Sequence, residues 1–208
     1  MPTAKEFWET EADKYVARPI ANMPAYEMTM ERTRAYLKPD DKVLEMGCGS
    51  GNTAMLLSRH VSHIWANDLC SRFIEIGSSK AREKNITNID FIEGDIMAPE
   101  LDNHAPYDCL LAFNLIHLFK DIPGAIERMH ALIKPGGIFI SKTGCLSGMR
   151  GLLRIPIAIM QVFGKAPHVS FVSASKLEAI MRTQGFEILE SRTFPKAGGS
   201  QFIIARKL

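Results

Sequence analysis

The pattern of hydrophobic and polar positions predicts alternating strands and helices through the middle of the chain. Short apolar runs alternate with longer segments of mixed polarity between residues 42 and 143. Runs of the first kind are typical of strands and segments of the second kind of helices. Strands are predicted at Lys42–Met46, Ser62–Asn67, Ile89–Glu93, Tyr107–Phe113 and Ile138–Thr143. Helices are predicted at Asn52–His60, Ser71–Lys84 and Ile122–Ile133.

Local signals sharpen these boundaries. Ser71 is placed to cap the second of these helices, because a serine at a helix start accepts a hydrogen bond from a free backbone N–H group. The run 109–113 is apolar throughout, as expected of a strand that is buried on both faces. Residues 134–137, Lys-Pro-Gly-Gly, predict a turn before the fifth strand.

The two ends of the chain differ from the middle. A helix is predicted over residues 4–18, and Pro24 can open a second one that runs to about Leu37. Near the carboxyl end, Ser173 caps a predicted helix that ends at Thr183. Strands at Phe186–Phe194 and Ser200–Arg206, joined by residues 195–199, fit an antiparallel hairpin at one sheet edge. No repeat or linker divides the sequence, so one domain over residues 1–208 is expected.

This order of elements predicts the fold class. Strands that alternate with helices form parallel sheets with helices on both faces. We therefore expect an α/β protein with a Rossmann-like, doubly wound sheet. Ligands of such sheets bind outside the carboxyl ends of the strands. The residues that follow each strand are the candidates for a functional site.

The first strand ends in Glu45 and is followed by glycines at 47, 49 and 51. Glycine permits a sharp turn from strand to helix and lets the backbone lie against a ligand. The dinucleotide fingerprint G-x-G-x-x-G fails here, because Asn52 stands at the position of its third glycine. The phosphate loop G-x-x-x-x-G-K-[ST] is also absent. The pattern indicates a nucleoside-cofactor loop, whereas a tight turn without a ligand is the structural alternative.

The motif Glu-x-Gly-x-Gly-x-Gly resembles the first motif of the class I S-adenosylmethionine-dependent methyltransferases, and Lys-Pro-Gly-Gly is also similar to that family. The resemblance covers residues 42–143 and implies a seven-stranded, mostly parallel sheet with an antiparallel edge strand. It implies methyl transfer from S-adenosylmethionine, which becomes S-adenosylhomocysteine. The chain also resembles the quinone-biosynthesis branch of the family, through general motifs. The cofactor residues implied are Tyr15, Glu45, Gly47, Cys48, Gly49, Gly51, Asp68, Leu69, Asp95, Ile96, Phe113 and Asn114.

Several of these residues have a role implied by the family and a structural alternative. Asp68 follows the second strand and would accept the ribose hydroxyls, but it would equally serve as a cap for the next helix. Asp95 would contact the adenine amino group and Ile96 the ring, but Gly-Asp is also common in turns. His117 would be the catalytic base or would orient the substrate, given the pKa range of histidine, whereas a lone histidine is more often structural.

Composition limits the range of partners. The 208 residues include 46% hydrophobic and 23% charged residues, with a net charge of +2 that gives no strong field for nucleic acid. The four cysteines form no C-x-x-C pair, so they indicate a reducing compartment, without a zinc site. No bound metal is expected. No apolar run approaches a membrane span, and the start of the chain has no secretory signal, so a cytoplasmic protein is expected.

Two regions are expected to shape the site of the methyl acceptor: a helical cap at 1–38 and an insertion at 146–172. The insertion is mostly apolar and carries Arg150, Arg154 and Lys165, so it is either a core helix or a lid with peripheral membrane contact. A small hydrophobic acceptor and a monomer or homodimer are expected. The alternatives are a protein or RNA methyltransferase, a NAD-binding oxidoreductase and a non-catalytic nucleoside-binding protein.

Overall fold

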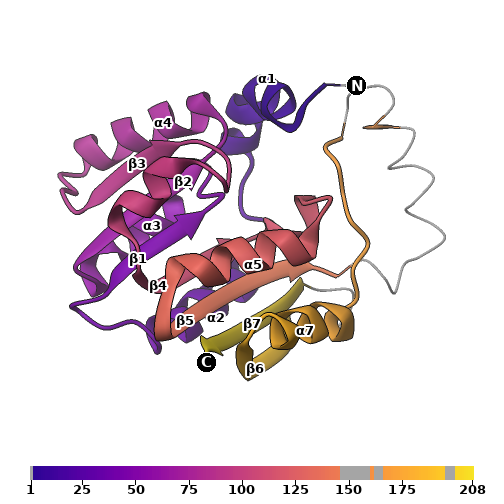
Figure 1. Cartoon of the computed structure of the whole chain (residues 1–208). Helices are drawn as coiled ribbons and strands as arrows, with labels where there is room; N and C mark the ends of the chain where they lie inside the picture. Colours follow the sequence, from indigo (N-terminus) through magenta and orange to yellow (C-terminus); the bar gives the residue numbers. More distant parts are fainter. Residues whose placement is uncertain (1, 146–159, 162–165, 195–199) are drawn as a thin grey trace.

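A computed structural model describes residues 2–145, 160–161, 166–194 and 200–208. Its strands are β1 (Lys42–Met46), β2 (His63–Asp68), β3 (Ile89–Glu93), β4 (Tyr107–Phe113), β5 (Ile133–Gly144), β6 (Phe186–Phe194) and β7 (Ser200–Lys207). Together they form a seven-stranded sheet within the described residues, in the order β3-β2-β1-β4-β5-β7-β6 (Figure 1). The predicted number of strands and the fold class are confirmed.

The sheet reverses its order of strands at β1. β1 pairs in parallel with β2 on one side and with β4 on the other, and β4 pairs in parallel with β5. β7 runs antiparallel to both β5 and β6, so the last two strands form the predicted hairpin at one edge. The carboxyl ends of β1 and β4 flank the point where the order reverses, and doubly wound folds bind ligands in the crevice at such a point.

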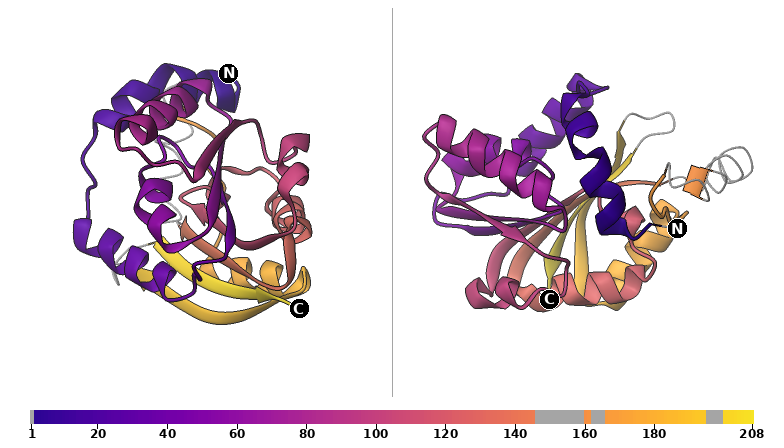
Figure 2. Two further views of the ribbon diagram at one scale, coloured as in Figure 1. Left: turned by 90° about the vertical axis from the view of Figure 1, so that its left-hand side faces the viewer. Right: turned by 90° about the horizontal axis from the view of Figure 1, so that it is seen from above.

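Helices cover both faces of the sheet (Figure 2). The α-helices are α1 (Ala4–Ala17), α2 (Met23–Arg34), α3 (Asn52–Leu57), α4 (Ser71–Glu83), α5 (Ile122–Leu132) and α7 (Ala174–Thr183). The short 3₁₀ helices are η1 (Ser58–His60), η2 (Pro99–His104) and η3 (Ile116–Leu118). α5 and α7 pack on one face with η2, while α2, α3 and α4 pack on the other.

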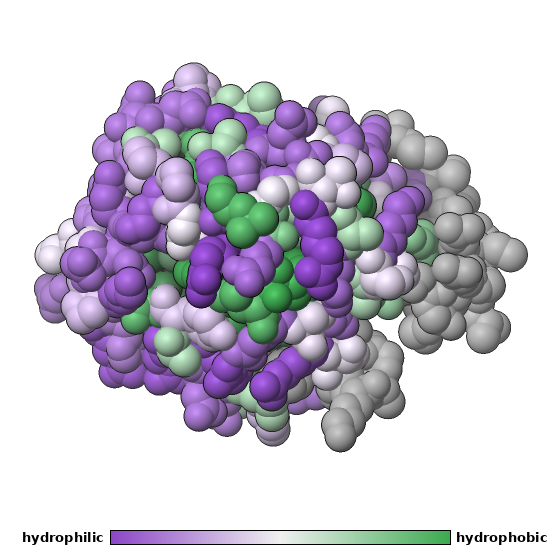
Figure 3. Space-filling view, turned by 60° about the horizontal axis from the view of Figure 1, so that its bottom comes forward, coloured by the Kyte–Doolittle hydropathy of each residue, from purple (hydrophilic) through white to green (hydrophobic). Residues whose placement is uncertain are grey.

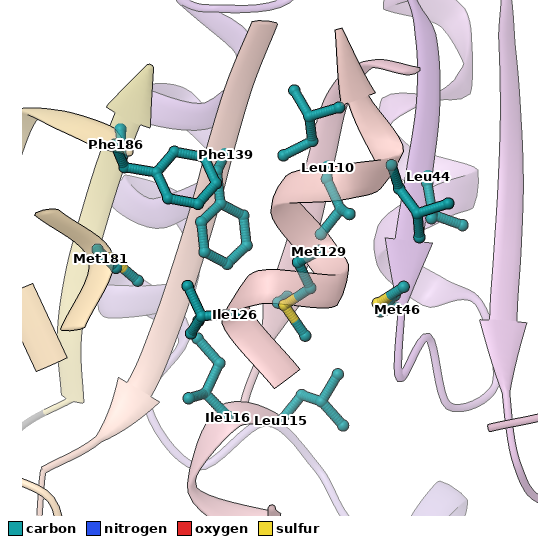
Figure 4. Packing of buried hydrophobic residues seen from close by; sticks show 14 of the residues in the cluster. Leu44, Met46, Leu110, Leu115, Ile116, Ile126, Met129, Phe139, Met181 and Phe186 are labelled. Atoms are coloured by element: carbon teal, nitrogen blue, oxygen red, sulfur yellow. The ribbon is translucent and has the colours of Figure 1, made fainter. Parts of the chain in front are cut away.

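The larger core lies under α5 and α7 (Figure 4). Leu110, Phe139 and Phe186 come from β4, β5 and β6 and are almost completely buried there. The rings of Phe139 and Phe186 lie 5.3 Å apart. Truncating a buried phenylalanine to alanine costs about 3–5 kcal/mol, so this layer fixes β4 and β5 firmly. The strand ends that carry the candidate site therefore rest on a rigid base.

Three local expectations change in the structure. Ser71 does not cap α4, since the helix begins at Ser71 itself and carboxylate oxygens of Glu9, on α1, accept from the N–H groups of Ser71 and Arg72. The helix after β1 ends at Leu57 and continues as η1. β5 begins at Ile133, five residues earlier than expected, and the Lys-Pro-Gly-Gly turn forms an irregularity within its pairing with β4.

Some predictions fall outside the described residues. The apolar part of the insertion, with Arg150, Arg154 and Lys165, lies there, as does the hairpin loop 195–199. Within the described part of the chain, no helix is long and apolar enough to cross a membrane. The surface seen from below is largely hydrophilic and has a small group of hydrophobic residues near its centre (Figure 3).

Candidate functional site

The glycine loop after β1 adopts a backbone conformation that glycine favours. Gly47, Gly49 and Gly51 have φ values of +65°, +53° and +71°. A Cβ atom on Gly47 would lie 2.8 Å from the Leu115 side chain, and one on Gly51 would lie 2.6 Å from the Phe91 ring. A Cβ atom on Gly49 would meet nothing within 4 Å. Two of the glycines therefore allow close packing, while the third leaves space in front of the loop.

That space belongs to a cavity of about 380 Å³, a volume within the range of small-molecule sites. Seven of the predicted residues line it: Tyr15, Glu45, Gly47, Cys48, Gly49, Phe113 and Asn114. Arg18 and Pro19, which belong to the predicted cap at 1–38, also line it. The other lining residues were not singled out in the sequence: Val16, Ile20, Ala21, Tyr26, Ser50, Asn52 and Thr53. Most of these belong to the α1–α2 segment, whose place over the strand ends depends on tertiary packing.

Glu45 is the most unusual residue of the cavity. Its side chain is buried at the end of β1, and its Oε2 atom has no hydrogen-bond partner among the described residues. Burial raises the pKa of this carboxyl group to about 8, although a hydrogen bond from the Ala54 backbone lowers it in part. A buried polar atom without a partner is rare in proteins. Glu45 therefore offers an acceptor for a cationic or hydrogen-bonding group of a ligand.

Asp68, at the end of β2, organises the backbone of the site. Its Oδ2 atom accepts from the Gly49 N–H at 2.9 Å, and its Oδ1 atom accepts from the Cys70 N–H at 3.0 Å. Burial is the largest influence on its pKa, which is raised. The side chain thus braces both the glycine loop and the start of α4. Each oxygen retains a second lone pair, so this bracing is compatible with binding ribose hydroxyls as well.

The remaining predicted residues lie away from the cavity wall. Asp95 is exposed, and its Oδ1 atom accepts from the Met97 N–H at 2.7 Å, as expected of a turn. Ile96 packs against the core under α5. Leu69, Gly51 and His117 are also absent from the cavity lining. The structure thus brings together the methionine side of the predicted site and leaves Asp95 and Ile96 farther along the sheet edge.

The turn after β4 places Asn114 and His117 next to β5. Asn114 has a φ of +55° and donates its N–H to the Lys142 carbonyl at 2.7 Å. His117 lies on η3, where its carbonyl accepts from the Ser170 N–H at 2.7 Å. Its Nδ1 atom is buried without a partner among the described residues, and burial lowers the pKa of the ring. A neutral imidazole with a free nitrogen can accept a proton.

α1 closes the site on the side of α4. Tyr15 makes edge-on contacts with the rings of Trp8 and Phe73, at 5.5 and 5.6 Å. Arg72, at the start of α4, pairs with Asp13 of α1 at 3.0 Å. These contacts and the Glu9 cap hold α1 against the segment that follows Asp68. The N-terminal helix therefore packs against α4 and forms part of the cavity wall.

The described residues contain no group of three or more histidine, cysteine, aspartate or glutamate side chains suited to hold a metal ion. All four cysteines are free. Burial raises the pKa of the Cys48 and Cys109 thiols well above its usual value. Cys48 thus acts at the site as a small buried side chain and not as a reactive thiolate.

Comparisons with known proteins agree with this geometry. The chain is 26% identical over 106 residues to an uncharacterized methyltransferase, YcgJ, of Bacillus subtilis, covering 51% of this chain and 42% of that protein. It is 23% identical over 139 residues to a ubiquinone biosynthesis O-methyltransferase of Acinetobacter baumannii, covering 66% and 57%. The chain thus spans about half the length of these relatives.

A solved structure of magnesium protoporphyrin IX methyltransferase from Synechocystis, with bound S-adenosylhomocysteine, has the same fold. The two superpose with a TM-score of 0.75 at 14% identity, over 98% of each chain. The sequence signature described as "Methyltransferase domain" matches residues 18–191, which is most of this chain. The protein belongs to the methyltransferase-domain family.

Proposed function

We propose that the protein transfers a methyl group from S-adenosylmethionine to a small, largely apolar acceptor. The observation that carries this proposal is the buried Oε2 atom of Glu45, which has no hydrogen-bond partner among the described residues and belongs to a cavity beside an open glycine loop. The methionine end of the cofactor carries an ammonium group, which can donate to such an acceptor. When bound, the cofactor supplies an electrophilic methyl group on a positively charged sulfur.

The residues around the cavity have distinct roles in this proposal. Glu45 holds the ammonium group, the backbone of Gly47 and Gly49 supports the methionine and ribose, and Asp68 accepts from the ribose hydroxyls. Asp95 and Ile96, which lie beyond the cavity along the sheet edge, would bind the adenine. Phe113 and Asn114 form the wall towards the transferable methyl group. These roles follow the family pattern and the places of the residues at successive strand ends.

The chain contributes orientation and exclusion of water. Segment 1–38 acts as a cap, because α1 and the residues after it line the cavity. Residues 146–172, which lie mostly outside the described ranges, stay the second region predicted to shape the acceptor site. A positively charged sulfur loses its charge during transfer, so a closed and dry site favours the reaction. His117 takes the proton of the acceptor or orients it, through the free Nδ1 atom.

The apolar character of the acceptor is supported by the cavity wall. Val16, Pro19, Ile20 and Phe113 contribute hydrophobic surface to it. Ile20 and the nearby Met23 are also more than 40% exposed. Hydrophobic groups at the opening of a site favour ligands with an apolar body.

The test is transfer of radioactive methyl groups from S-adenosylmethionine to a panel of apolar small molecules, a protein mixture and RNA. We expect a small molecule to be labelled, and labelling to stop when S-adenosylhomocysteine is in excess. Binding of NAD in place of the sulfur nucleosides would contradict the proposal. Labelling of protein or RNA alone would leave the cofactor assignment intact and overturn the proposed acceptor class.

A further inference from the structure

One long stretch of the chain has an unusual charge balance. Residues 128–177 contain no aspartate or glutamate, although they contain seven lysine and arginine residues. The whole chain is nearly balanced, with 25 basic and 23 acidic residues. This stretch includes β5 and the insertion on the expected acceptor side. Lys142, near the middle of this stretch, therefore has no acidic neighbour in sequence, and it also lacks one in space.

Lys142 lies near the carboxyl end of β5, half-buried beneath α2. Its Nζ atom donates to the Thr29 hydroxyl at 3.0 Å and lies 3.5 Å from the Ala25 carbonyl. The Thr29 hydroxyl itself donates to that same carbonyl at 2.6 Å. An ammonium group has three donors, so these two neutral oxygens leave one N–H group to be satisfied.

No carboxylate neutralises this lysine. None of the ion pairs among the described residues includes Lys142. The residues outside the described ranges contain no aspartate or glutamate either. Burial lowers the pKa of Lys142, and no neighbouring charge offsets this effect. A positive charge that is removed from water normally has a negative partner.

A second lysine shows why Lys142 is unusual. Lys207 also binds only carbonyl oxygens, those of His130 and Ile133, and its pKa is also lowered by burial. These carbonyls lie at the carboxyl end of α5, where the helix dipole is negative and favours a cation. Ala25, in contrast, lies in the first turn of α2, at the positive end of the α2 dipole. The surroundings of Lys142 therefore favour an anion beside it.

Lys142 is a neighbour of residues that line the cavity, although it is not itself a lining residue. Its partner in the β4–β5 register is Phe113, which lines the cavity, and Ala25 precedes Tyr26, which lines it as well. β5 lies on the far side of β4 from β1 and its glycine loop, and α2 crosses beside it (Figure 1). The lysine is thus placed beyond the methionine end of the proposed cofactor site. In the proposed function, the acceptor binds on this side.

We propose that Lys142 binds a carboxylate group of the methyl acceptor, which is otherwise apolar. This inference rests on the proposed function and adds a specificity-determining residue to it. The carboxylate supplies the missing partner of Lys142 and completes its hydrogen bonds. A charge-assisted hydrogen bond of this kind is both strong and directional.

The experiment measures binding of matched acids and amides to the protein saturated with S-adenosylhomocysteine. The probes are 4-hydroxybenzoate with 4-hydroxybenzamide, and 3-phenylpropanoate with 3-phenylpropanamide. We expect at least one acid to bind tenfold or more tightly than its amide. Lys142→Met is expected to remove this preference, and Lys142→Arg, which keeps the charge, to retain most of it.

Lys176→Met is the matched control, because Lys176 is an exposed lysine of the same acid-free stretch and lies on α7. It is expected to keep the preference for the acid. Equal or undetectable binding of acid and amide by the wild-type protein overturns the inference, whether or not the variants fold. A preference that survives in Lys142→Met also overturns it, as does a loss of S-adenosylhomocysteine affinity in that variant. The proposed function fails separately, if the wild-type protein does not bind the sulfur nucleosides.

Discussion

The strands on the two sides of the point where the strand order reverses differ in how their polar groups are satisfied. Around β1 and β2, Asp68 bonds to the loop and to the start of α4, and the Asn67 amide bonds to the carbonyls of Ile92 and Gly94. Around β5, the side-chain oxygens of Ser141 and Thr143 and the Nδ1 atom of His117 are buried without partners among the described residues. The polar side chains at the end of β2 are satisfied without a ligand, whereas these three groups near β5 are not.

This difference matches a division of labour between a constant ligand and a variable one. A cofactor that is the same in every turnover is bound well by a preorganised backbone. Groups that are buried without partners carry an energetic cost, which a ligand can remove by supplying a hydrogen bond. On the side of β1 and β2, the Oε2 atom of Glu45 and the Nε1 atom of Trp65 also lack partners among the described residues, and the proposed partner of Glu45 is the cofactor.

The largest expected effect comes from Asp68→Ala, which breaks the organised side. It removes the bonds to Gly49 and Cys70 together with the proposed ribose contact. We expect cofactor affinity to fall by about 100-fold or more, since hydrogen bonds to charged groups contribute about 1.5–3 kcal/mol each. Methyl transfer should be abolished at ordinary cofactor concentrations. Calorimetric titration measures the affinity, and full activity in this variant would show that the site is assigned wrongly.

His117→Ala tests the other side of the comparison. Loss of a proton acceptor typically slows a reaction by about 10²–10⁴-fold. We expect such a loss in the rate of transfer, with unchanged affinity for S-adenosylhomocysteine, because the proposed role of His117 concerns the acceptor and not the cofactor. Steady-state kinetics and titration separate the two quantities. If cofactor affinity falls as much as the rate, then His117 supports the fold and not the chemistry.

Gly51→Ala and Gly49→Ala separate packing from ligand access within the loop. Both add the strain of a positive φ, about 1–2 kcal/mol. Only Gly51→Ala also forces a Cβ atom against the Phe91 ring, at 2.6 Å. We expect its free energy of unfolding to fall by about 3 kcal/mol, since overpacking adds about 1–3 kcal/mol. Gly49→Ala should be less destabilising, yet lose cofactor affinity. Equal loss of stability in both variants, by denaturant unfolding, would contradict the packing assigned to Gly51.

The pH dependence of stability reports on Glu45. A carboxyl group whose folded pKa is raised from 4.5 to about 8 stabilises the protein fully below pH 4.5. That contribution is lost as the pH rises towards 8, at up to about 1.4 kcal/mol per pH unit. We expect Glu45→Gln to reduce this decline in the ligand-free protein. Unfolding curves between pH 5 and pH 8, taken on both proteins, measure it. Parallel curves for the two would show that Glu45 is charged in the folded state.

The smallest effect is expected for Glu9→Gln, which weakens the attachment of α1. Glu9 accepts from the N–H groups of Ser71 and Arg72 and from the Ser71 hydroxyl. Loss of a helix cap costs about 1 kcal/mol. We expect a fall of that order in the free energy of unfolding, measured with denaturant. Glu75→Gln is the control, since its ion pair with Arg72 is exposed and contributes little. A similar fall in the free energy of unfolding of both variants would show that the Glu9 cap contributes no more than an exposed ion pair.

The sequence predicted what local chemistry determines. Buried parallel strands are apolar runs, and the strand-to-helix loop requires glycines at fixed positions, so both could be located without a structure. The cap of α4 could not, because Glu9 is 62 residues away from Ser71 and contacts it only through tertiary packing. The wall formed by Ile20, Ala21 and Tyr26 depends on how α1 folds back over the strand ends. The lack of a carboxylate near the Lys142 ammonium group depends on distances in space and could not be predicted, although the acid-free stretch around Lys142 is visible in the sequence.

The most direct test of the account is calorimetric titration of the wild-type protein and of Glu45→Gln with S-adenosylmethionine, S-adenosylhomocysteine and NAD. We expect micromolar binding of both sulfur nucleosides to the wild type, at least tenfold weaker binding to Glu45→Gln, and no binding of NAD. Equal affinity in the two proteins would show that Glu45 does not hold the cofactor. Absence of binding to the wild type would contradict the central claim that the glycine loop and its cavity form an S-adenosylmethionine site.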